Sequence, residues 1–120
     1  MPRLFLPRRL KRRELGGSAA ALAEVVGAWR KGIFSELPAK GVVGCRLLKA
    51  YVTTPLGARR TLFLLQAASG DTVFLMHRPK GDPVGDNMAY ANSAFRVQLN
   101  KALRVAAEDI EAGAFEVVDR

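Results

Sequence analysis

Three apolar runs follow one another between residues 42 and 78, and they restrict the possible folds more than any other feature of the sequence. They read VVGCRLLKAYVTT (42–54), RRTLFLLQA (59–67) and DTVFLMHR (71–78), and the short turns PLGA and ASG separate them. Runs rich in β-branched and apolar residues and bounded by turn residues predict strands. Because the turns are short, neighbouring strands should pair antiparallel as a meander. The strand middles are apolar on both faces, so other elements must cover at least part of each face.

Two amphipathic helices are expected to cover this meander. The first lies between Ser18, a good N-cap, and Gly32, where a helix normally stops. Gly27 in its middle favours close packing there or a break into two helices. The second helix ends near Gly113. The apolar stripes are Leu22, Val25, Val26, Trp29 and Ile33 in the first helix, and Phe95, Leu99, Ala102, Leu103, Ala106 and Ile110 in the second, for which Asp86, Asn87 and Asn92 are candidate caps.

Short strands are expected at both ends of the chain. Leu4 to Leu6 form an apolar run that Pro7 breaks, and this run is compatible with an edge strand, since proline cannot donate to an interior ladder. The sequence AFEVVDR at the end can add another strand. The order is therefore strand, helix or helix pair, three-strand meander, long helix and final strand. This order predicts one α+β domain over residues 1–120, too small for a second independent core.

The charge of the chain points to polyanionic partners. Its formal net charge is +8, from 19 Lys and Arg against 11 Asp and Glu. Such a field attracts nucleic acid, acidic proteins or anionic membranes. The simplest interpretation of the basic start is a solvated, charged turn or loop. The charges are unevenly spread, with Arg3, Arg8, Arg9, Lys11, Arg12 and Arg13 near the start and Glu108, Asp109, Glu111, Glu116 and Asp119 near the end.

Several kinds of site and location are disfavoured. Cys45 is the only cysteine, which favours a reducing cytoplasm, and His77 is the only histidine, which leaves zinc without enough ligands. No apolar stretch approaches the roughly 18 residues that span a bilayer, and MPRLFLPRRLKRR lacks the apolar segment of a secretory signal. Asp82 and Asp86 lack calcium-loop spacing, so a turn explains GDPVGDN more simply. With no nucleotide-binding motif either, we expect no metal and no cofactor.

Cations on the meander are the side chains best suited to chemistry. In an antiparallel meander the start of the second strand and the end of the third meet, which brings Arg60, Arg78 and Lys80 together beside the loop PKGDPVG. Guanidinium groups match phosphate oxygens, and several together can hold a phosphodiester and the charge that develops during its cleavage. The alternative is that these cations solvate strand ends and pair with the acidic tail. The full set is Arg46, Lys49, Arg59, Arg60, Arg78 and Lys80.

Strand alternation decides which side chains share a face. By this rule Arg60 and Arg78 can point to one face, the latter together with Phe74 and Met76, whereas His77 points to the other. A catalytic acid role for His77 is therefore disfavoured. Aromatic rings can stack on bases where they are exposed. Tyr51, Tyr90 and Phe95 are the candidates; Phe95 is expected in the core, and Tyr90 is the freer tyrosine.

The order of elements, together with these cations, resembles toxins of the RelE/ParE superfamily, in particular the RelE- and HigB-like branch of bacterial toxin–antitoxin systems. The resemblance covers nearly the whole chain, through PRLFLPRRL, WRKGIF, GVVGCRLLKA, GARRTLFLLQ, DTVFLMHRPKGD and the helix after NMAYAN. Its most telling parts are a Gly-Val step followed by Arg46 and Lys49, the strand GARRTLFLL, and the cations after the last strand.

The resemblance implies a RelE-like sheet whose concave face binds mRNA, usually in the ribosomal decoding site, and cleaves it without metal. In such enzymes the 2′-hydroxyl of the substrate attacks the adjacent phosphate while basic side chains orient it, stabilise charge and protonate the leaving oxygen. Matched by position, Arg60 would stabilise the phosphate, Lys80 or Arg78 is the cation after the last strand, and Lys49 or Arg46 the cation on the earlier strand. Arg59, Tyr90 and His77 are further candidates for RNA binding.

The resemblance also implies a cognate antitoxin as partner, inhibition of translation in the cytoplasm, and no membrane. The chain departs from the family in having no histidine or tyrosine near its acidic C-terminus, where some members keep a general acid or base. This leaves open a weakened nuclease, a different catalytic set, or inhibition of a topoisomerase as by ParE. Two other classes stay open: a non-catalytic nucleic-acid-binding module, and a subunit whose basic surface binds an acidic protein.

Overall fold

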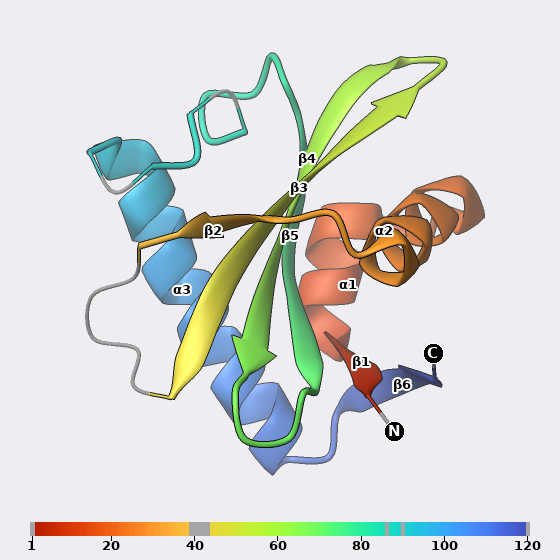
Figure 1. Ribbon diagram of the computed structural model, residues 1–120, viewed down its shortest axis with the longest axis vertical. Helices are drawn as coiled ribbons and strands as arrows, with labels where there is room; N and C mark the ends of the chain where they lie inside the picture. Colours follow the sequence, from red (N-terminus) through yellow and green to blue (C-terminus); the bar gives the residue numbers. More distant parts are fainter. Residues whose placement is uncertain (1, 39–43, 86, 90, 120) are drawn as a thin grey trace.

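The structure is a computed structural model that describes residues 2–38, 44–85, 87–89 and 91–119. One sheet of six strands, in the order β2-β3-β4-β5-β1-β6, carries helices on both faces (Figure 1). This confirms the expected α+β class. The elements are β1 (Arg3–Pro7), α1 (Arg8–Leu15), α2 (Ala19–Lys31), β2 (Ser35–Leu37), β3 (Cys45–Thr54), β4 (Gly57–Gln66), β5 (Thr72–Pro79), α3 (Ser93–Glu111) and β6 (Phe115–Asp119).

The centre of the sheet is the expected meander, in which β3, β4 and β5 pair antiparallel. Beyond β5 lies β1, which runs parallel to it, and β6 then pairs antiparallel with β1. The expectation that the first strand lies at a sheet edge is therefore wrong. Pro7 is tolerated in this interior strand because it is the last residue of β1, past the pairs with β5, which involve Leu4 and Phe5.

The pairing of β4 and β5 shifts by one residue in the middle of the sheet. Leu62 pairs with Met76, but the next pair is Phe63 with Phe74, so Leu75 is the extra residue of a bulge. Strand alternation therefore breaks at this point. Arg78 shares its face with Met76, as expected, but Phe74 lies on the opposite face.

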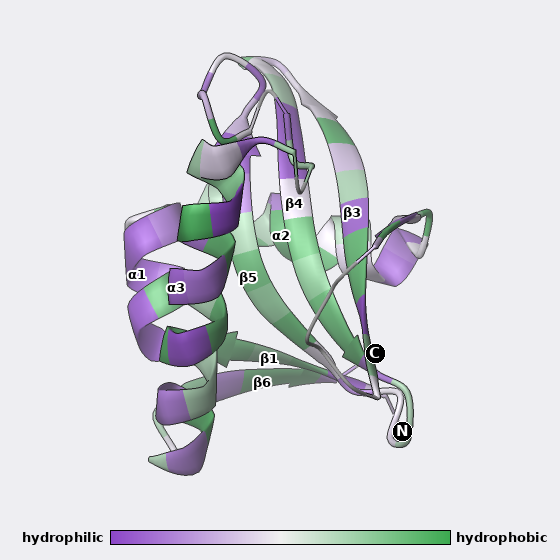
Figure 2. Ribbon diagram, turned by 90° about the vertical axis from the view of Figure 1, so that its left-hand side faces the viewer, coloured by the Kyte–Doolittle hydropathy of each residue, from purple (hydrophilic) through white to green (hydrophobic). Residues whose placement is uncertain are grey.

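Both faces of the meander are covered. On one face the apolar stripe of α3 packs over β4 and β5, near Leu64 and Val73. On the other face lies α2, where the Nε1–H of the buried Trp29 donates to Thr72 Oγ1 at 3.3 Å. The remaining helix, α1, contacts both α3 and β5, and Figure 2 shows α1 and α3 on the same side of the sheet. The core is therefore continuous from the sheet into both helix layers.

The helix ends confirm the capping signals. Ser18 Oγ accepts the backbone N–H of Ala21, Gly32 adopts a left-handed conformation at φ 71°, and Asn92 caps α3. The short strand β2, Ser35–Leu37, was not expected from the sequence. No helix in the described part of the chain has the length and apolar character needed to cross a membrane.

Candidate nucleic-acid interface

Two cations and an exposed tyrosine come together on the face of the meander that α3 partly covers. Lys49 and Tyr51 point to the same face because they are two residues apart on β3, and Arg60 of β4 pairs directly with Tyr51. The Nζ of Lys49 lies 5.5 Å from the centroid of the Tyr51 ring, and the Cζ of Arg60 lies 5.3 Å from it. Tyr51 is 61% exposed. We call these three residues the Tyr51 cluster.

The loop after β5 holds Arg60 in this cluster. Nη1 of Arg60 donates to the carbonyl oxygen of Gly85 at 2.8 Å. Gly85 is buried so closely against the end of β5 that a Cβ there would clash with the carbonyl oxygen of Pro79 and with Cβ of Arg78. Asp82 Oδ1 in turn accepts the backbone N–H of Gly85 at 3.2 Å. The aspartate therefore serves a turn, as the sequence indicated, and the turn places the carbonyl that orients Arg60.

Arg78 pairs across the ladder with Arg60, yet its guanidinium turns away to α1. Its Nε and Nη2 donate to the two carboxylate oxygens of Glu14 at 2.6 and 2.9 Å. These hydrogen bonds raise the pKa of Arg78 above its usual value, although burial opposes them. With its side chain 18% exposed and its charge neutralised by Glu14, Arg78 is a structural cation in this conformation.

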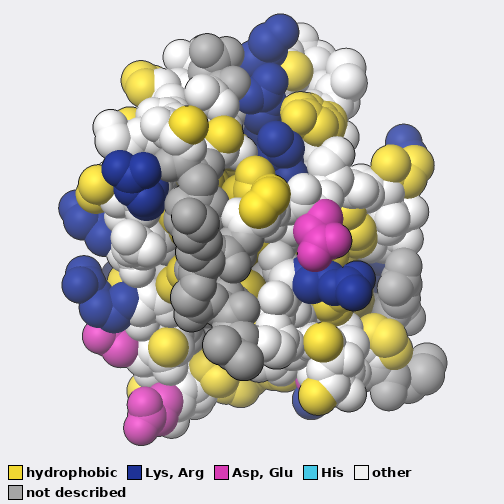
Figure 3. Space-filling model, turned by 60° about the vertical axis from the view of Figure 1, so that its left-hand side comes forward, with side chains coloured by type: hydrophobic (Ala, Val, Ile, Leu, Met, Phe, Trp, Pro, Cys, Tyr) yellow, Lys and Arg dark blue, Asp and Glu magenta, His cyan; other side chains and the backbone are white. Residues whose placement is uncertain are grey.

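Lys80 lies just after β5, where its backbone N–H donates to the carbonyl oxygen of Ala58 at 3.0 Å. It is exposed, and among the described residues neither Lys80 nor Lys49 has a carboxylate within ion-pair distance. In Figure 3, basic side chains gather in a column at the top of the molecule, and acidic ones lie lower. The start of β4, which carries Arg59 and Arg60, pairs with the end of β5, and Lys80 follows directly after β5.

Two of the proposed cations lie on the opposite face. Arg46 is three residues from Lys49, an odd spacing that places it on the other side of β3, where its Nε lies 3.7 Å from Glu36 Oε1. Arg59 alternates with Arg60 and lines a cleft between α2 and the meander. The structure therefore separates Arg46 and Arg59 from the Tyr51 cluster.

His77 also faces α2 and is 5% exposed, in agreement with the alternation rule. Its Nδ1 lies 2.7 Å from Thr61 Oγ1, and its Nε2 lies 3.0 Å from Glu24 Oε1. The imidazole therefore joins α2 to the centre of the sheet. The other RNA-binding candidate, Tyr90, lies outside the described residues.

The acidic end of the chain pairs with the basic start. Lys11 Nζ lies 2.7 Å from Glu116, and Arg9 holds the buried Asp109 through its backbone N–H and its Nε, at 2.9 and 2.7 Å. Burial raises the pKa of Asp109, but the hydrogen bonds from Arg9 outweigh it and leave that pKa below its usual value. Among the ion pairs described, none joins the acidic tail to a meander cation, in contrast to the alternative considered for those cations.

The described part of the chain places no group of three or more His, Cys, Asp or Glu side chains where they could hold a metal ion. From the sequence, Tyr51 was one of three aromatic residues that could stack on a base if exposed. The structure shows that its side chain is exposed. No protein-family model, curated protein or solved structure matches this chain.

Proposed function

We propose that the protein binds RNA through the Tyr51 cluster and cleaves it without a metal ion, as the toxin of a toxin–antitoxin pair. The observation that carries this proposal is the pairing of two cations with an exposed aromatic ring on one face of the sheet. A groove that binds RNA without sequence readout needs cations for the phosphates and a ring for the bases. The net charge of +8 draws such a polyanion to the surface.

The chemistry uses the substrate's own nucleophile. The 2′-oxygen attacks the adjacent phosphorus and its proton passes to water, while the P–O5′ bond breaks and the 5′-oxygen takes up a proton. Arg60 binds the non-bridging oxygens, because a guanidinium matches their geometry and offsets the charge that grows on them. The ammonium of Lys49 or Lys80 supplies the proton to the leaving oxygen. Arg78 supports this site indirectly, by bracing the end of β5 against Glu14.

In this proposal the protein acts in the cytoplasm on mRNA, with the ribosome as the expected context, and a cognate antitoxin covers the basic surface to neutralise it. A non-catalytic RNA-binding module is the second candidate. It is favoured by the position of His77, whose imidazole contacts Thr61 and Glu24 on the opposite face and so is not placed to act as a general base beside the Tyr51 cluster.

The test is to express the protein in a bacterial host and to map the 5′ ends of cellular RNA. We expect growth arrest and new ends within translated frames, and we expect both to disappear in the Arg60→Ala, Lys80→Ala double variant. Arg46→Ala is the matched control, since it removes an exposed cation from the opposite face of β3. Arrest without new RNA ends would point to a topoisomerase or another target. Binding without cleavage or arrest would favour the non-catalytic module.

A further inference from the structure

We infer that Tyr51 is a stacking surface for an unpaired base, so that the substrate class is single-stranded RNA. This inference rests on the proposed function, because it concerns the same face of the sheet. It goes further in assigning the recognition of a base to one ring and in excluding a continuous duplex as the preferred ligand.

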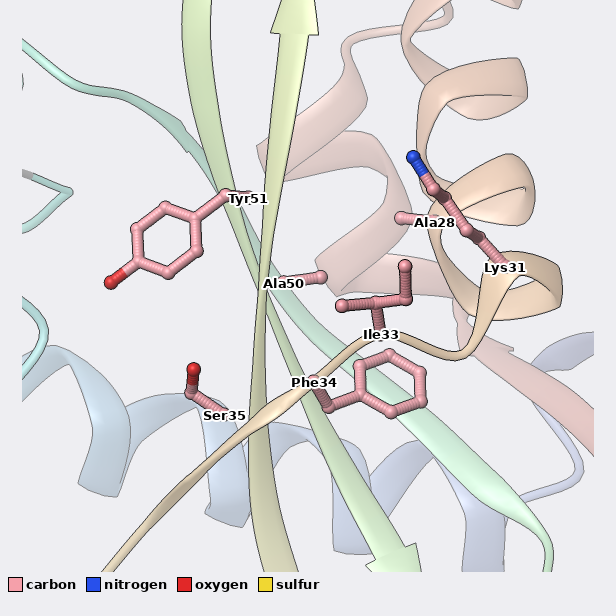
Figure 4. Close-up of a pocket in the computed structure, with 7 residues that line it drawn as sticks. All are labelled: Ala28, Lys31, Ile33, Phe34, Ser35, Ala50 and Tyr51. Atoms are coloured by element: carbon pink, nitrogen blue, oxygen red, sulfur yellow. The ribbon is translucent and has the colours of Figure 1, made fainter.

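Among the aromatic side chains in the described part of the chain, Tyr51 alone is mostly exposed. Its strand neighbour Ala50 is buried under α2, and Arg60 directly across from it is half-buried, yet Tyr51 itself is 61% exposed. Figure 4 shows the ring pointing away from α2, on the same side of β3 as Ser35, whereas Ala28 and Lys31 lie on the other side. A ring left in water in the middle of a strand contributes little to the core. A role in binding explains its place better.

The neighbours of the ring match the parts of one nucleotide. Lys49 and Arg60 each place a positive charge over the Tyr51 ring, within 5.5 Å of its centroid, one from along β3 and one from across the ladder, so a base that stacks there takes the place of a cation. A nucleotide presents a flat apolar base next to a charged phosphate. When the base lies against Tyr51, its flanking phosphates therefore come within reach of the two cations.

Stacking on a protein ring requires a base whose flat surface is accessible. In a duplex, neighbouring bases cover these surfaces, and the grooves of A-form RNA present only base edges, phosphates and 2′-hydroxyls. Tyr51 therefore selects an unpaired strand. Of the other aromatic candidates, Phe95 is fully buried and cannot take this role, while Tyr90 lies outside the described residues.

The experiment measures equilibrium binding of a fluorescent 2′-O-methyl oligoribonucleotide, which lacks the attacking hydroxyl and so cannot be cleaved. Wild type is compared with Tyr51→Phe, Tyr51→Leu and Lys49→Ala, using the single strand, the same sequence as a duplex, and single strands with one base removed. We expect wild type to prefer the single strand, Tyr51→Phe to bind as wild type, and Tyr51→Leu to bind roughly 5- to 150-fold more weakly. Removing the stacked base from the oligonucleotide should weaken its binding to wild type but not its binding to Tyr51→Leu.

Two results would overturn the inference, and they separate it from the proposed function. If Lys49→Ala weakens binding while Tyr51→Leu does not, the cluster holds phosphates only, and RNA binding stands without a stacked base. If wild type binds neither single strand nor duplex, the proposed function fails and the inference fails with it. Since Tyr51 is exposed, thermal unfolding of Tyr51→Leu should match that of wild type, which shows that lost binding is not lost fold.

Discussion

The carboxylate of Glu14 on α1 is held by the guanidinium of Arg78 on β5 through hydrogen bonds of 2.6 and 2.9 Å. The same carboxylate accepts the backbone N–H of His77 at 3.0 Å, at a point of β5 beyond its pairs with β1. Glu14 thus accepts a backbone N–H on the edge of β5 that β1 no longer pairs with. Because its side chain is only 3% exposed, Glu14 depends on these donors for its charge to be tolerated.

Arg78→Met should therefore lower stability by roughly 3 kcal/mol, since it leaves the buried Glu14 carboxylate with only the longer contact to Arg13, whose Nε lies 3.8 Å from Glu14 Oε2. Adding Glu14→Gln should restore part of this loss, because Gln is neutral and its oxygen can still accept the N–H of His77. Denaturant unfolding of both single variants and the double variant measures the coupling. Additive losses would contradict the structural role given to Arg78. A stable but inactive Arg78→Met variant would return Arg78 to the catalytic set.

Gly85→Ala tests how the loop after β5 orients Arg60. The added methyl would clash with the end of β5, and the carbonyl that accepts from Arg60 must move. We expect a loss of about 1–3 kcal/mol in stability, measured by thermal unfolding, together with weaker RNA binding. Gly81→Ala, four residues earlier, meets open space and serves as the control. An unchanged affinity in a folded Gly85→Ala variant would show that Arg60 does not need this carbonyl.

The acid sensitivity of the fold should depend on Asp109. Its pKa is lowered in the folded protein, although burial alone would raise it, because the hydrogen bonds from Arg9 favour the charged form. A carboxyl whose folded pKa is depressed adds stability that is full above its unfolded pKa, about 3.9, and is lost as the pH falls through the folded value. Asp109→Asn should cost roughly 1.5–3 kcal/mol at pH 7.

Urea unfolding between pH 7 and pH 2.5 checks this. The difference in the free energy of unfolding between wild type and Asp109→Asn should stay constant above about pH 5 and shrink below about pH 4. The pKa of Asp71 is also lowered, by the hydrogen bond from the Arg3 side chain, so the stability of the Asp109→Asn variant should still fall in part as the pH is lowered. A difference that does not change with pH would mean that the charge of Asp109 is not what Arg9 stabilises.

Much of the fold could be predicted from local features of the sequence. Apolar runs between short turns predicted β3, β4 and β5, and Ser18, Gly32 and Asn92 marked helix ends that the structure confirms. Such signals depend on neighbours in the chain, so a single sequence reveals them. The parallel position of β1 beside β5 depends on residues nearly 70 apart, Leu4 and Thr72, and no local pattern encodes it.

The same distinction explains the candidate site. Strand alternation correctly placed His77 and Arg78 on opposite faces of the sheet. It placed Phe74 on the wrong face, because the sequence of an apolar run does not reveal a bulge. The partner of Arg78 is 64 residues away in a segment whose other charges are mostly basic. Whether Tyr51 is exposed depends on how far the helices reach over the sheet, which is a tertiary property.

The salt dependence of RNA binding separates the Tyr51 cluster from the overall charge of the chain. Each phosphate neutralised by a cation releases counterions, so the logarithm of the affinity falls with the logarithm of salt by about 0.7 per contact on a single strand. Lys49→Ala and Arg60→Ala should each reduce this slope by about 0.7. Arg46→Ala removes the same formal charge from the opposite face of β3 and should leave the slope unchanged.

The measurement is fluorescence anisotropy of the single strand between 50 and 300 mM KCl (about 14 to 6 Å of screening length) for wild type and the three variants. Equal slopes in all three variants would mean that RNA responds to the net charge of +8 and not to particular contacts. A smaller slope in the two cluster variants alone would locate the phosphates beside Tyr51. The base of the same nucleotide would then lie close to the one exposed ring described on that face, because phosphate and base are joined through a single sugar.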